Sequence, residues 1–110
     1  MTFPYEFPFN LEDSPMPFVN GQVTVAATPT QVCAVPGGSG VVLQNNGSAA
    51  VFIGGGSVAA SGANQGISLA AGASMTLSTY GVGTEIVAHE LWAIVESGTN
   101  PLNYLVITGG

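Results

Sequence analysis

The chain has no lysine and no arginine among its 110 residues, and its formal charges come from six acids and give −6 at pH 7 with the one histidine neutral. Proteins bind nucleic acid mainly through Lys and Arg that neutralise phosphates, so we expect no DNA or RNA partner. An anionic membrane surface is unfavourable for the same reason. Because intramolecular salt bridges are almost impossible, packing and backbone hydrogen bonds must hold the fold.

Cysteine is nearly absent as well, since Cys33 is the only one and no internal disulfide can form. No run of apolar residues reaches the length of a membrane span, and the N-terminus lacks the pattern of a signal peptide. The chain is 46% hydrophobic and only 5% charged. This composition predicts one folded domain with little charge at its surface. Such a domain either covers its strand edges in an oligomer or is prone to aggregation.

Residues 1–21 differ in kind from the rest, because they hold four of the seven prolines and half of the acids. Proline fixes φ and favours extended neighbours, so this segment is predicted to be an extended arm. Aromatic residues alternate along its first half, which places their rings on one side of an extended chain. We expect these rings to contact another polypeptide, the alternative being that they fold back over the arm's own domain. The predicted contact residues are Phe3, Tyr5, Phe7, Phe9 and Phe18.

Residues 22–110 alternate short β-type runs with Gly, Asn and Ser, which predicts about eight strands. Turn signals every eight to twelve residues favour an all-β antiparallel sandwich or barrel of jelly-roll-like form. Asn46-Gly47 is typical of a tight hairpin turn, so we expect the runs on either side of it to pair. The expected strands are 22–26, 31–35, 41–44, 50–53, 66–69, 74–78, 91–95 and 104–108.

The last two runs are apolar on both faces, whereas a sandwich strand needs only one apolar face. The second face is therefore a candidate subunit interface, for which we name Trp92, Ile94, Leu105 and Ile107. Residues 85–96 could also be drawn as an amphipathic helix. Their β-branched content and the lack of a helical neighbour favour a strand.

Catalytic residue types gather only at Glu85, His89 and Glu90. On a strand, His89 and Glu90 point to opposite faces, and zinc needs three or four ligands, so we predict neither a metal site nor an acid–base site. Residues 54–59 fit a Gly-x-Gly-x-x-Ala pattern, but no helix or distant acid follows, and a loop is expected instead. We therefore expect no cofactor and no enzymatic activity.

Six segments form a recurring strand-and-turn pattern along the chain, namely QVTVA at 22–26, TQVCA at 30–34, VVLQNNGS at 41–48, AVFIGG at 50–55, GISLAAGASMTL at 66–77 and LWAIVESGT at 91–99. Taken in this order, they resemble the small β-sandwich proteins that decorate the capsid exterior of tailed bacteriophages. Their pattern also occurs in phage tail and fibre modules.

The resemblance implies a virion structural protein on the outer capsid surface, where homotrimers bridge subunits of the major capsid protein and act as cement. The arm has no part in the resemblance, so its role rests on composition. The alternative is a tail, fibre or carbohydrate-binding module, in which Trp92, Tyr80 or Tyr104 could stack on sugar rings.

Overall fold

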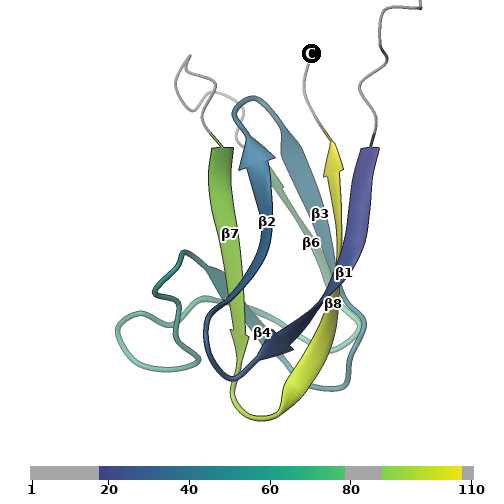
Figure 1. Ribbon diagram of the computed structural model, residues 1–110. Helices are drawn as coiled ribbons and strands as arrows, with labels where there is room; N and C mark the ends of the chain where they lie inside the picture. The colour runs from purple at the N-terminus through teal and green to yellow at the C-terminus, as the bar shows by residue number, and fades with distance from the viewer. Residues whose placement is uncertain (1–17, 79–87, 108–110) are drawn as a thin grey trace, which may run out of the picture.

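The computed structural model describes residues 18–78 and 88–107, which form eight β-strands and no helix (Figure 1). The number of strands and the absence of helix in these ranges confirm the predicted all-β class. The strands are β1 (Phe18–Ala26), β2 (Thr30–Pro36), β3 (Gly40–Asn45), β4 (Val51–Gly54), β5 (Ile67–Leu69), β6 (Ser74–Ser78), β7 (Ala88–Val95) and β8 (Thr99–Ile107).

The strands form two four-stranded antiparallel sheets that face each other as a sandwich. Sheet A has the order β1-β8-β3-β6 and sheet B the order β2-β7-β4-β5. The pairs β1–β8, β2–β7, β3–β6 and β4–β5 are nested one inside the next along the chain. This nesting is the arrangement of a jelly roll, in which a long antiparallel ribbon is wrapped into two sheets.

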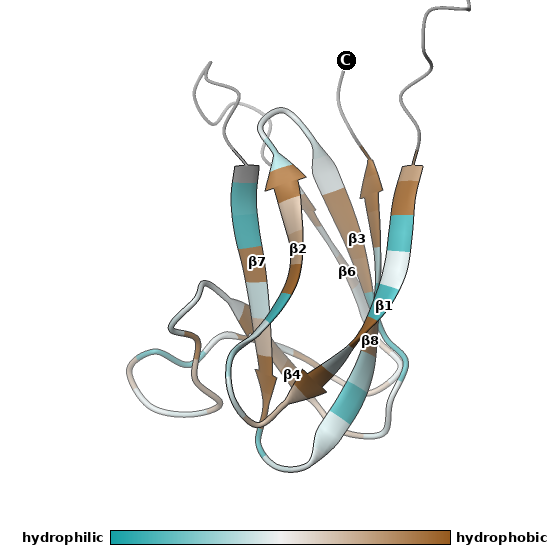
Figure 2. Cartoon of the chain, viewed as in Figure 1, coloured by the Kyte–Doolittle hydropathy of each residue, from teal (hydrophilic) through white to brown (hydrophobic). Residues whose placement is uncertain are grey.

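The core lies between the sheets and consists almost entirely of aliphatic side chains at alternate strand positions (Figure 2). Alternation follows from the two-residue period of a strand, which sends neighbouring side chains to opposite faces. Val25, Leu43, Val51 and Leu102 are fully buried. The rest of the buried cluster is Val32, Val35, Val41, Ile53, Leu69, Ala93, Val95 and Val106.

The predicted hairpin across Asn46-Gly47 is wrong, because β3 belongs to sheet A and β4 to sheet B. Gly47 does not have a positive φ, so the segment is not the tight turn that this pair suggests. Its glycine is needed for another reason: a Cβ there would overlap the side-chain amide of Asn100. The segment instead carries the chain from one sheet to the other.

Residues 96–98 likewise carry the chain from one sheet to the other, because β7 and β8 lie in different sheets. Gly98 has a φ of +70°, a conformation that glycine adopts without steric cost. Within residues 88–95 the strand prediction is confirmed over the helical alternative.

The N-terminal boundary differs from the expected one, because β1 begins at Phe18 and not at residue 22. Phe18–Gly21 pair with Ile107–Tyr104 of β8. Pro17 has no backbone N–H to donate to a ladder, whereas the residues after it can pair. The segment 1–17, with Phe3, Tyr5, Phe7 and Phe9, lies outside the described residues, as do 79–87 and 108–110.

Candidate functional site

One end of the sandwich, which we call the open end, gathers the points where undescribed segments join the described strands. Across sheet A, Phe18 of β1 pairs with Ile107 of β8, and Gly40 of β3 pairs with both Ile107 and Ser78 of β6. The start of β1 and the ends of β8 and β6 therefore lie in one row. The start of β7 is at the same end of sheet B, beside the end of β2 (Figure 1). Segments 1–17, 79–87 and 108–110 all connect here.

An apolar cleft of about 270 Å³ opens between the sheets on the side of β1 and β2. These two edge strands are joined at the far end and diverge toward the open end (Figure 1). Val19, Cys33, Pro36 and Tyr104 are among the residues that line the cleft, and no lining residue is charged. Val19 and Phe18 remain 49% and 66% exposed, so the open end has an uncovered apolar rim.

Two side chains that line the cleft, Tyr104 and Cys33, are closely surrounded by neighbouring atoms. The Tyr104 hydroxyl lies against the Cα of Gly21, where an added Cβ would come within 2.7 Å of the oxygen. Burial raises the pKa of the Cys33 thiol above its ordinary value of 9.0, because a thiolate is poorly solvated there. Cys33 is thus a neutral, half-buried apolar contact at neutral pH.

The outer surface of sheet A, which we call the sheet A face, has no charged residue at any outward position of its four strands. Toward the open end its outward positions carry four apolar residues, Phe18, Val42, Leu105 and Ile107, and three polar ones, Asn20, Thr76 and Ser78. Farther along the strands it becomes polar but stays neutral.

An amide ladder crosses three strands of the sheet A face. Gln22 Nε2 donates to Asn103 Oδ1 at 2.8 Å, and Asn103 Nδ2 donates to Gln44 Oε1 at 3.5 Å. A shallow groove of about 310 Å³ lies beside the ladder, next to Val42 and Leu105. The sheet A face therefore offers hydrogen-bonding groups and apolar surface without charge.

The four residues predicted for a subunit interface are divided between two opposite surfaces. Leu105 and Ile107 lie on the sheet A face, half-buried. Trp92 and Ile94 lie on the outer surface of sheet B, where Ile94 is only 7% exposed and has little area left for a partner. Trp92 is covered in part by its own chain, because Gly56 lies near its ring and Glu90 Oε1 accepts a hydrogen bond from Nε1 at 3.3 Å.

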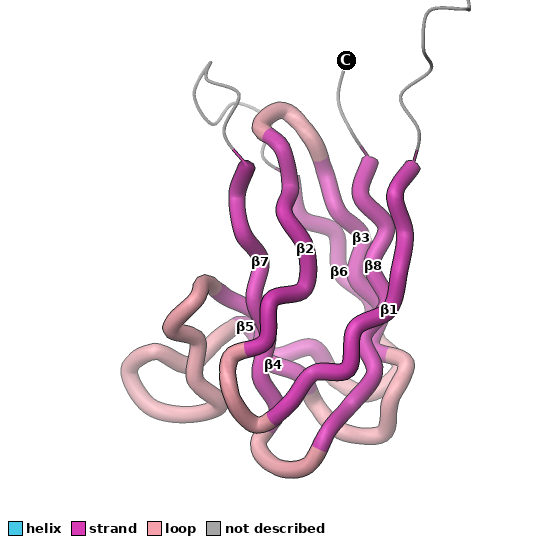
Figure 3. The backbone as a smooth tube through the Cα atoms, viewed as in Figure 1, coloured by secondary structure: helices cyan, strands magenta, loops and turns pink. Residues whose placement is uncertain are grey.

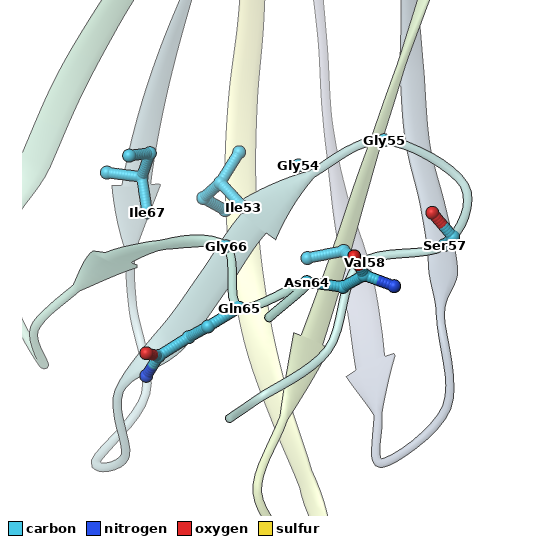
Figure 4. Close-up of a pocket in the computed structure, with 9 residues that line it drawn as sticks. All are labelled: Ile53, Gly54, Gly55, Ser57, Val58, Asn64, Gln65, Gly66 and Ile67. Carbon is cyan, nitrogen blue, oxygen red and sulfur yellow. The ribbon is translucent and has the colours of Figure 1, made fainter. Parts of the chain in front are cut away.

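The long connection between β4 and β5 forms a second pocket, of about 260 Å³ (Figure 4). This connection projects from the side of sheet B (Figure 3). It is closed by the hydrogen bonds from Ala59 N to Asn64 O at 2.9 Å and from Gly66 N to Ala59 O at 3.1 Å. The Gly-x-Gly-x-x-Ala run lies in this loop and starts no helix, as expected.

The pocket of the loop is neutral in character. Ser57, Asn64 and Gln65 supply polar atoms and Ile53, Val58 and Ile67 supply apolar surface, as the close-up shows (Figure 4). Gln65 Nε2 already donates to Ala60 O at 3.1 Å. None of the residues that line this pocket has an acidic or basic side chain.

The candidate catalytic residues do not form a cluster in the described part of the chain. Alternation along β7 puts His89 on the side of the core and Glu90 on the outer side with Trp92. Glu85 and Tyr80 lie outside the described residues. Across residues 18–78 and 88–107 there is no group of three His, Cys, Asp or Glu placed to hold a metal ion, and no helix long and apolar enough to cross a membrane.

Two features escaped the sequence reasoning, namely the buried Asn45–Asn100 pair and the amide ladder. Both had a signal. Asn45 continues the inward alternation of Val41 and Leu43, and Asn100 precedes Leu102 on the same face. A polar residue at an inward position indicates a buried polar network.

Comparison with known proteins finds no matching family model, no similar curated protein and no similar solved structure.

Proposed function

We propose that this chain is a virion structural protein that decorates the outside of a tailed-bacteriophage capsid and stabilises it by binding the major capsid protein. The resemblance of roughly residues 20–110 to such proteins suggests this role. Jelly rolls occur in viral structural proteins and in lectins, so the fold by itself does not choose between those classes. The choice between these two classes rests on which surfaces of the sandwich are exposed for contact with a partner.

The observation that carries the proposal is the open end. The starts of β1 and β7 and the ends of β6 and β8 lie there, and Phe18 and Val19 form an exposed apolar rim beside a neutral cleft. An arm that starts at this rim can reach across a boundary between capsid subunits while the sandwich stays outside. Attachment through such a rim is mainly hydrophobic, since no Lys or Arg is available.

Assembly into a homotrimer would strengthen attachment. Three arms tied to one body bind at a high effective concentration, so weak individual contacts give strong retention. Each docked aromatic side chain contributes roughly 1.5–3 kcal/mol through burial. Binding of this kind should resist added salt, because it does not depend on ion pairs.

The test is co-sedimentation with heads assembled from the major capsid protein of the phage that encodes the chain. Phe18→Ser should weaken binding at least about tenfold, and deletion of residues 1–17 should weaken it further. Ile67→Ser is the matched control, because Ile67 is 64% exposed but lies beside the loop pocket. A chain that fails to sediment with the heads, or leaves them in moderate salt, contradicts the proposal.

A carbohydrate-binding module is the second candidate, favoured by the neutral loop pocket beside Trp92. Amide and hydroxyl groups next to an aromatic ring suit the hydroxyls and apolar faces of sugars. Glycan-array binding that Trp92→Ala abolishes, with the melting temperature retained, would support this candidate over capsid decoration.

A further inference from the structure

The sheet A face has the composition of a contact between identical chains. Any two copies carry the same negative charge, so they approach most easily through surfaces without acids. The described acids, Glu90 and Glu96, lie on β7 and just after it, in sheet B. The outward positions of β1, β8, β3 and β6 contain none.

The amide ladder is self-complementary. Its internal hydrogen bonds use Gln22 Nε2 and Gln44 Oε1, which leaves Gln22 Oε1 as an acceptor at one end and Gln44 Nε2 as a donor at the other. Asn103, on the strand between them, lies at the centre of the ladder. A two-fold axis that runs along β8, between two facing sheets, would bring Gln44 of one copy opposite Gln22 of the other.

From these relationships we infer that the sheet A face packs against the same face of a second copy about a two-fold axis. In such a pair, Gln44 Nε2 of each copy donates a hydrogen bond to Gln22 Oε1 of the other, so the same bond forms twice. The Leu105 side chains of the two copies lie near the axis. Aligned packing of two sheets at about 30° is the usual geometry for such faces. The sheet A face includes Phe18, so pairing would cover part of the rim that the proposed function assigns to the capsid, and the two contacts compete at that residue.

The size of the face sets the strength of the contact. About this axis β1, β8 and β3 of one copy face β3, β8 and β1 of the other, and β6 has no strand opposite it. At a strand spacing of about 4.8 Å the facing strands cover roughly 350 Å². A pair would bury about 700 Å² in total, which is below the usual size of a stable interface. The pair should therefore be weak and depend on concentration, with dissociation in the micromolar range or above.

The experiment measures the solution mass of the full chain by sedimentation over micromolar to millimolar concentrations. We expect an assembly with an even number of copies, which Gln44→Glu halves by placing charges in the interface. Gln31→Glu makes the same chemical change at an exposed position on β2, in the other sheet, and should leave the mass unchanged. Circular dichroism checks that each variant remains folded.

A charge exchange tests the geometry directly. The double variant Gln22→Lys/Gln44→Glu places opposite charges across the two-fold axis and should restore association that Gln44→Glu alone removes, in a form that salt weakens. A monomer or a trimer at all concentrations overturns the inference, as does an even assembly that Gln44→Glu leaves intact. Capsid binding by a variant that no longer pairs would leave the proposed function standing.

Discussion

Asn100 Nδ2 donates a hydrogen bond of 2.7 Å to Oδ1 of Asn45, and both side chains are almost completely buried. Asn45 Nδ2 in turn donates to the carbonyl oxygen of Leu69 in sheet B at 2.9 Å and to that of Ala49 at 2.8 Å. Ala49 N donates to Asn100 Oδ1 at 3.1 Å. The two amides thus connect the end of β3, the start of β8, the connection after β3 and a strand of the opposite sheet.

Asn45→Ala should lower the free energy of unfolding by about 2–4 kcal/mol, because it leaves buried donors and acceptors without partners. Urea denaturation measures the change. Asn46→Ala is the matched control, since Asn46 is exposed and its replacement should change stability by less than about 0.5 kcal/mol. Equal effects at the two positions would contradict the role assigned to the buried pair.

The strands could be predicted from the sequence because each one carries its own local signal. Alternation at Val23 and Val25, or at Met75 and Leu77, follows directly from the strand period and needs no knowledge of the partner strand. Partners could not be predicted in this way. A turn signal such as Asn46-Gly47 reports local backbone, whereas in a jelly roll most successive strands lie in opposite sheets.

For the same reason, the sequence could not show that the four residues named for a subunit interface lie on two opposite surfaces. Trp92 and Leu105 both occupy strands that are apolar on two faces, but the sequence does not say that those strands belong to different sheets. Ile94 illustrates a second limit. Its burial at 7% exposure depends on the three-dimensional packing around β7, which no local pattern encodes.

Gly66→Ala should destabilise the protein by about 2 kcal/mol or more, because an added Cβ would lie 2.5 Å from the carbonyl oxygen of Ile53 and 2.8 Å from its nitrogen. The backbone of Ile53 pairs with Ile67 and cannot move without disturbing the β4–β5 ladder. Gly55→Ala, in the same loop, has open space around it and should be close to neutral. Thermal unfolding of the two variants compares them; similar melting temperatures would argue against this tight contact.

The stability that Cys33 contributes should decline at alkaline pH. Burial raises the pKa of its thiol in the folded protein, so the unfolded chain loses this proton first as the pH rises past about 9.0. The contribution is complete below that pH and is lost as the pH rises through the folded-state pKa. Unfolding free energies measured from about pH 7 to about pH 10 should fall less steeply for Cys33→Ala than for the wild type. If the unfolding free energies of the wild type and of Cys33→Ala fell equally with pH, the proposed contribution of the Cys33 thiol would be wrong.

Mild acid should leave the fold intact. No Lys or Arg exists to form ion pairs with the carboxylates, so protonation of acids reduces repulsion and breaks no salt bridge. We expect the melting temperature to hold or rise between pH 7 and about pH 5. Calorimetry over this range measures the melting temperature, and a steep fall between pH 7 and about pH 5 would contradict the prediction.

The nested pairing of β1 with β8 has a consequence for biosynthesis. The innermost pair, β4 with β5, closes the shortest span of chain, whereas residues 18–26 must wait for residues 99–107 before they gain a partner. On the ribosome the first strand is therefore made early and kept unpaired until translation of the last one is complete. We expect such a chain to fold more slowly than a helical protein of equal length, because most of its contacts join residues that are far apart in the sequence.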